Sequence, residues 1–79
     1  MTIDDIRTFL RTEILNDPTR EIGEEEDLLL SETLDSLGVT RLVGFLERET
    51  GLEIPAQHVT LKNFASLKKI DAYLASRAG

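Results

Sequence analysis

The stretch that decides the fold runs from residue 33 to residue 51 and reads TLDSLGVTRLVGFLERETG. After its serine, apolar residues recur at the spacing of an amphipathic helix and form one stripe of Val39, Leu42, Val43 and Leu46. Gly51 follows where a helix commonly ends in a left-handed residue. The pattern therefore predicts a helix over residues 36–50 whose apolar stripe faces a core.

Ser36 stands at the start of this helix, where a hydroxyl can serve two purposes. It can act as the N-cap by accepting a hydrogen bond from a backbone N–H of the first turn. It can also carry a phosphate ester, because free backbone N–H groups and the positive end of the helix dipole favour an anion there. Spacing and dipole do not decide between a cap and a modification site.

The helix face opposite the apolar stripe is small and partly apolar. Leu37 projects there beside Ser36, Thr40 and Gly44. The charged residues that flank this face are Arg41, Glu47 and Arg48. A glycine inside a helix costs about 1 kcal/mol relative to alanine, so Gly44 calls for a reason. Close packing against another segment and clearance for an attached group or a docking protein both explain it.

Three further helices are predicted around this one. Thr2 is the N-cap of a first helix over residues 3–15, and Ser66 is the N-cap of the last helix. Thr60 opens a short helical turn within residues 58–64. The apolar anchors of that turn are Val59, Leu61 and Phe64. We therefore expect an all-α fold, a small four-helix bundle with three main helices and one short helix.

A long connection over residues 16–35 separates the first two main helices. Its acidic run, residues 21–27, precedes three leucines at positions 28–30. Loops this long in small domains are commonly functional or disordered. The leucines favour order, since some of them can reach the core and hold the loop down.

The composition argues against several classes of function. The 79 residues carry a net charge of −6, with one histidine and no cysteine. An acidic chain is a poor match for nucleic acid, and without cysteine there is no disulfide, thiolate metal site or cysteine nucleophile. No apolar run approaches the roughly 18 residues of a membrane span, and the acidic start lacks the features of a secretory signal. We expect a cytoplasmic monomer without a bound metal.

Two kinds of chemistry do not fit the sequence. A hydrolase built on Ser36 and His58 would need a G-x-S-x-G turn after a strand, which the chain lacks. His58 is better explained as a surface or loop-packing residue. A calcium-binding EF-hand loop counted from Asp17 places Ile22 where glycine belongs and Leu28 where glutamate belongs. Neither prediction is supported.

The segment Asp35-Ser36-Leu37, between the acidic loop and LVGFLERETGLEIP, resembles the acyl and peptidyl carrier protein family over nearly the whole chain. The resemblance implies one carrier domain over residues 1–79 and no enzyme activity. It implies that Ser36 receives 4'-phosphopantetheine from coenzyme A through a separate, magnesium-dependent phosphopantetheinyl transferase. The thiol of this arm would carry an acyl or aminoacyl group as a thioester.

The family's motif also suggests which residues meet partner enzymes. Asp35 matches the aspartate of the motif, and Leu37 matches a leucine that contacts partners. The expected partner-binding residues are Asp35, Leu37, Thr40, Arg41, Gly44, Glu47 and Arg48. Residues that line the space near the arm, or serve as ordinary core, are Val39, Val43, Leu46, Ile54, Val59 and Phe64.

Two departures from fatty acid carriers narrow the expected pathway. Arg41 stands where those carriers usually have an acid, and Leu34 replaces their alanine before Asp35. The chain therefore resembles stand-alone carriers of specialised fatty acid-like, polyketide or nonribosomal peptide-type pathways. Its partners would be an acyl- or aminoacyl-activating ligase and a downstream synthase or transferase. The alternative is an unmodified helical adaptor that binds a protein through its acidic loop and the Leu37 face.

Overall fold

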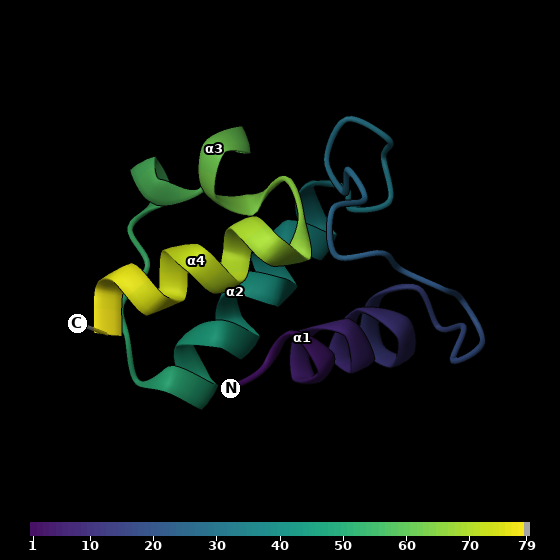
Figure 1. Ribbon diagram of the computed structural model, residues 1–79, viewed down its shortest axis with the longest axis horizontal. Helices are drawn as coiled ribbons and strands as arrows, with labels where there is room; N and C mark the ends of the chain where they lie inside the picture. Colours follow the sequence, from purple (N-terminus) through teal and green to yellow (C-terminus); the bar gives the residue numbers. More distant parts are fainter. Residues whose placement is uncertain (79) are drawn as a thin grey trace.

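Helices make up all the regular secondary structure in residues 1–78, the part of the chain that this computed structural model describes (Figure 1). The elements are α1 (Ile3–Phe9), η1 (Leu10–Ile14), α2 (Ser36–Thr50), η2 (Ala56–His58), α3 (Leu61–Phe64) and α4 (Leu67–Ala78). Together α1 and η1 form the first main helix, while α2 and α4 are the other two and α3 is the short one. The predicted all-α bundle is confirmed.

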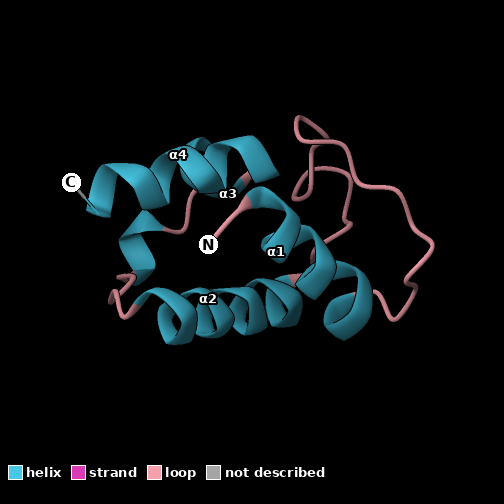
Figure 2. Ribbon diagram, turned by 60° about the horizontal axis from the view of Figure 1, so that its bottom comes forward, coloured by secondary structure: helices cyan, strands magenta, loops and turns pink. Residues whose placement is uncertain are grey.

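The main helices enclose one core, with the long loop at one end of the molecule (Figure 2). The helices pack as α1 against α4, η1 against α2, and α3 against α4. The fully buried large side chains are Ile6, Leu10, Leu28, Leu42, Leu46, Phe64, Leu67 and Ile70. None of the helices in residues 1–78 is long and apolar enough to cross a membrane.

The first main helix begins as predicted but changes its winding. The Thr2 hydroxyl accepts from the Asp5 N–H at 3.2 Å, and the Asp5 carboxylate accepts from the Thr2 N–H at 2.9 Å. The hydrogen bond from the Thr2 N–H, followed by an interaction with the Thr2 hydroxyl, lowers the pKa of the Asp5 carboxyl. From Leu10 onward the helix is a π-helix, in which the Leu15 N–H donates to the Leu10 carbonyl at 2.8 Å. The helix thus covers the predicted residues with a wider second half.

The long loop is held to the core through Leu28. This side chain is fully buried, and its N–H donates to the Ala65 carbonyl at 2.7 Å. Its carbonyl accepts from the N–H of Leu34, which is 4% exposed. The prediction that leucines hold the loop down is confirmed for Leu28, whereas Leu30 remains 72% exposed.

The segment before α4 matches the sequence prediction only in part. Thr60 precedes α3 as expected, and Phe64 is fully buried. Leu61 was expected to be an anchor of the core, but it is 50% exposed because it begins α3 on the outer side. The Ser66 hydroxyl accepts from the Lys69 N–H at 3.2 Å, which confirms its role as the cap of α4.

Candidate functional site

Asp35, and not Ser36, caps the second main helix. Its backbone is extended, with φ −93° and ψ −176°, and its Oδ1 accepts from the Gly38 N–H at 2.7 Å. An extended residue just before the first helical residue is the geometry in which a carboxylate reaches the third N–H of a helix. The alternative in which Ser36 is the N-cap is therefore wrong.

Ser36 is instead the first residue within α2, and its side chain is exposed. The structure gives its hydroxyl no hydrogen-bond partner within residues 1–78, although its carbonyl accepts from the Thr40 hydroxyl at 3.0 Å. The capping of α2 by its neighbour leaves the Ser36 hydroxyl available for chemistry.

Replacing Asp35 tests whether its carboxylate caps α2. We expect Asp35→Ala to lower the free energy of unfolding by about 1 kcal/mol, because the Gly38 N–H loses its acceptor. Asp35→Asn keeps an acceptor oxygen and should be close to wild type. Urea unfolding of the three proteins measures the difference. Equal stability of wild type and Asp35→Ala would show that this hydrogen bond does not stabilise the fold.

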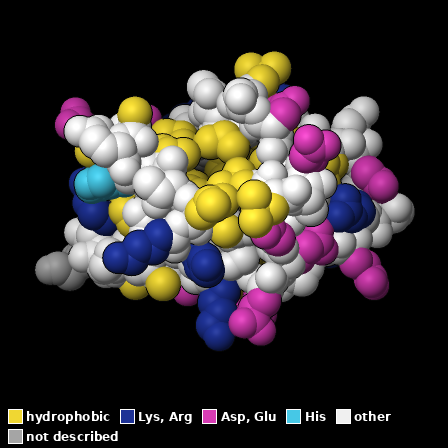
Figure 3. All heavy atoms as spheres, turned by 90° about the horizontal axis from the view of Figure 1, so that it is seen from above, with side chains coloured by type: hydrophobic (Ala, Val, Ile, Leu, Met, Phe, Trp, Pro, Cys, Tyr) yellow, Lys and Arg dark blue, Asp and Glu magenta, His cyan; other side chains and the backbone are white. Residues whose placement is uncertain are grey.

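An open hollow of about 350 Å³ lies beside Ser36. It is lined by Leu29, Leu34, Asp35, Ser36, Val39 and Val59. Figure 3, which looks down on α3 and the long loop, shows apolar side chains gathered on this side of the molecule. The hollow therefore offers a mainly apolar surface next to the serine hydroxyl.

Of the six residues that the sequence suggested for the space near the arm, only two line the hollow. Val39 and Val59 line it, and Val43 packs against the core while remaining partly exposed. The other three candidates are core residues: Leu46, Ile54 and Phe64. Leu29 and Leu34 were missed, although both are apolar residues close to Asp35 and Ser36 in the sequence.

Most of the residues predicted for the outward face of α2 are exposed in the structure. Leu37 is 67% exposed, and the other exposed members are Thr40, Arg41, Gly44 and Arg48. Glu47 differs from these, because its Oε2 accepts from the Ile54 N–H at 2.8 Å. This hydrogen bond holds the segment after α2 against the helix, so the Glu47 carboxylate has a structural role.

Gly44 faces open space. A Cβ built at this position meets no heavy atom within 4 Å, so close packing within the described chain does not explain this glycine. The other explanation, clearance for an attached group or a docking protein, remains. At Gly38, by contrast, a Cβ would lie 3.2 Å from Asp35 Oδ1 and 3.3 Å from Ile14 Cγ2. The two glycines of α2 thus have opposite surroundings.

This contrast predicts opposite effects of alanine. We expect Gly44→Ala to raise the free energy of unfolding by about 0.5 to 1 kcal/mol through helix propensity. Gly38→Ala should lower it by about 1 to 3 kcal/mol, because the added methyl overpacks a tight contact. Thermal unfolding followed by circular dichroism measures both. A destabilising Gly44→Ala would mean that another segment covers this face.

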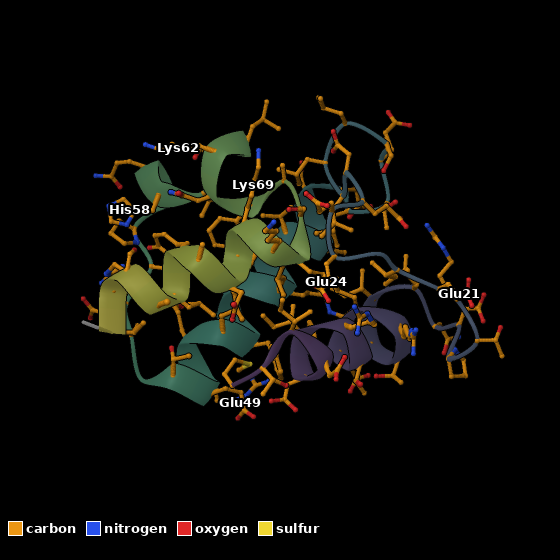
Figure 4. The ribbon with its side chains drawn as sticks, viewed as in Figure 1. Glu21, Glu24, Glu49, His58, Lys62 and Lys69 are labelled. Carbon is orange, nitrogen blue, oxygen red and sulfur yellow. The ribbon has the colours of Figure 1, made fainter. Side chains whose placement is uncertain are left out.

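His58 lies away from the hollow and is held by α4. Its Nδ1 is 2.8 Å from the Tyr73 hydroxyl, which also accepts from Arg77 at 2.8 Å. Figure 4 places His58 near the C-terminal end of α4. His58 is half-buried and does not line the hollow beside Ser36, in keeping with a loop-packing role.

A small helical bundle with a free serine hydroxyl at a helix start, beside an open hollow, has the arrangement of a carrier domain. The family model described as "Phosphopantetheine attachment site" matches residues 5–73, and the chain belongs to this family. Members of the family carry 4'-phosphopantetheine covalently and are not themselves catalytic. The chain is therefore a carrier and not an enzyme, with a phosphopantetheinyl transferase and pathway enzymes as partners.

The fold is also similar to that of a chain in a solved structure described as "Crystal structure of FAD-dependent dehydrogenase". The TM-score is 0.78 with 20% sequence identity, and the match covers 86% of this chain and 96% of that chain. At this identity the similarity is one of fold. No curated protein matches the chain.

Proposed function

We propose that Ser36 carries the 4'-phosphopantetheine arm and that the whole chain works as one carrier domain. The observation that supports this most is the exposed Ser36 hydroxyl, which has no hydrogen-bond partner within residues 1–78 because Asp35 caps α2. The hydroxyl oxygen forms a new ester bond to the phosphorus that carries the pantetheine in coenzyme A. The pyrophosphate bond of coenzyme A breaks, adenosine 3',5'-bisphosphate leaves, and the hydroxyl proton passes to the transferase. Backbone N–H groups in the first turn of α2 and the helix dipole favour the resulting anion.

The arm supplies the thiol that the chain lacks, since the sequence contains no cysteine. We propose that this thiol holds an acyl or aminoacyl group as a thioester in the cytoplasm. An activating ligase would load it, and a downstream synthase or transferase would use it. The enzymes would meet the outward face of α2, whose exposed residues beside Ser36 are Leu37, Thr40, Arg41, Gly44 and Arg48.

Intact mass spectrometry tests the modification. The apo-protein is incubated with coenzyme A, magnesium and a broad-specificity phosphopantetheinyl transferase. We expect the mass to increase by one 4'-phosphopantetheinyl group, and fragmentation should place this group on Ser36. If several transferases leave the mass of the folded protein unchanged, the chain is better explained as an unmodified adaptor.

We further propose that the carrier serves a dedicated specialised pathway and not general fatty acid synthesis. Arg41, which is exposed five residues after Ser36, supports this, because fatty acid carriers usually have an acid there. The test offers the loaded carrier to the enzymes of a general fatty acid synthase, with that system's own carrier as reference. Equal elongation on both carriers would contradict the narrower proposal.

A further inference from the structure

One exposed stripe of α2 carries two positive charges and no acidic residue, and it is formed by Leu37, Arg41, Gly44 and Arg48. The exposed Glu49 lies on another side of the helix. Arg41 and Arg48 are exposed there, and neither side chain has an ion pair or hydrogen bond within residues 1–78. Glu47 forms no ion pair with either arginine within residues 1–78, and its Oε2 accepts from the Ile54 N–H at 2.8 Å. Two arginines thus remain free to interact with groups outside this chain.

Acidic residues concentrate in a different part of the molecule. Of the fifteen acidic residues, eleven lie within residues 1–35, before α2 begins. Figure 3 shows most of the visible acidic side chains toward one end. Residues 36–79 hold four acidic and six basic residues, so the half of the chain that contains α2 is basic although the whole chain has a net charge of −6.

Three of the segments that contribute to or adjoin the hollow beside Ser36 also carry an exposed leucine. Leu30, Leu37 and Leu61 are 72%, 67% and 50% exposed. Each lies within two residues of a residue that lines the hollow, namely Leu29, Ser36 and Val59. The long loop, α2 and α3 thus each carry one exposed leucine close in sequence to a residue of the hollow, and exposed apolar groups are typical of protein interaction sites.

We propose that this face docks enzymes whose own surface is acidic, with carboxylates opposite Arg41 and Arg48 and an apolar recess for Leu37. The inference rests on the proposed function, since an enzyme that reaches the Ser36 hydroxyl must also cover the next turns of α2. Complementary charges accelerate association and lose their effect as salt increases.

A charge-swap experiment tests the docking surface. One broad-specificity transferase is made in two forms, with either glutamates or lysines at the surface positions that face α2 of a bound carrier. At low salt we expect kcat/KM for loading the wild type to be about tenfold higher with the glutamate form. Raising the salt concentration should reduce this preference. Equal rates with the two forms, or a preference for the lysine form, would overturn the proposal.

Variants of the carrier identify the charges responsible. Arg41→Glu should invert the preference between the two transferases, and Arg48→Glu should shift it in the same direction. Lys69→Glu is the matched control, because Lys69 is exposed on α4 and its reversal changes the net charge equally. If Lys69→Glu shifts the preference as much as Arg41→Glu, net charge and not docking explains the rates. Failure of both transferases to load any carrier would instead refute the assignment of Ser36.

A second copy of this chain is the other candidate occupant, because its acidic loop could meet the arginines. Sedimentation equilibrium at low salt distinguishes the two. We expect the wild type to remain monomeric over the concentrations used for loading. Self-association that salt weakens and Arg41→Glu abolishes would assign this face to the second copy and overturn the proposal.

Discussion

Ser36→Ala is expected to abolish loading by the transferase while leaving the fold intact. The loss should be complete, because alanine has no oxygen to form the ester with the phosphate. The free energy of unfolding should change by less than about 0.5 kcal/mol, since the Ser36 hydroxyl makes no hydrogen bond within residues 1–78. Intact mass spectrometry measures the first quantity and urea unfolding the second.

The combination of the two results separates the roles that the sequence left open. A capping serine would lose about 1 kcal/mol on change to alanine, as we expect for Asp35→Ala. Ser76→Ala serves as a control, because Ser76 is also exposed but lies on α4. Its loading should equal that of the wild type. Continued loading of Ser36→Ala at the wild-type rate would place the arm on another residue.

The second large effect is expected at the anchor of the long loop. Leu28→Ala should lower the free energy of unfolding by about 3 kcal/mol, because it leaves a cavity at a fully buried position. This is a large share of the roughly 4 to 12 kcal/mol typical of a domain of this size. Urea unfolding at 25 °C measures the change.

Leu30→Ala is the matched control, with the same chemical change two residues away. Leu30 is 72% exposed, so its truncation should alter stability by less than about 0.5 kcal/mol. Leu28→Ala should also slow loading of the protein that remains folded, because the adjacent Leu29 lines the hollow beside Ser36. Equal stability of the two variants would mean that the loop is not fixed to the core through Leu28.

The second main helix was the most predictable part of the fold. Its apolar period identified the buried Leu42 and Leu46, and Gly51 ends it with φ 75°, as a left-handed cap. The cap at its start was harder to assign. Asp35 and Ser36 are adjacent, and both are favoured N-cap residues. Only the backbone geometry shows that the aspartate takes this position.

Other features depend on contacts between segments distant in the sequence. Nothing in the three consecutive leucines, residues 28–30, shows that the first is buried and the last exposed, because this depends on the hydrogen bond to Ala65. The π-helix from Leu10 has no signal in local composition. Leu61 fits the apolar pattern of a core residue, yet the direction in which α3 begins leaves it half-exposed.

The cluster of His58, Tyr73 and Arg77 joins η2 to α4 through hydrogen bonds. Arg77 can only donate, so the Tyr73 oxygen accepts from it at 2.8 Å, and the same hydroxyl lies 2.8 Å from His58 Nδ1. The Nδ1 atom of His58 is thus engaged in a hydrogen bond with the Tyr73 hydroxyl. The one histidine of the chain fastens η2 to α4 and is no base for Ser36. If Ser36 is loaded as proposed, we therefore expect its proton to pass to a group other than His58.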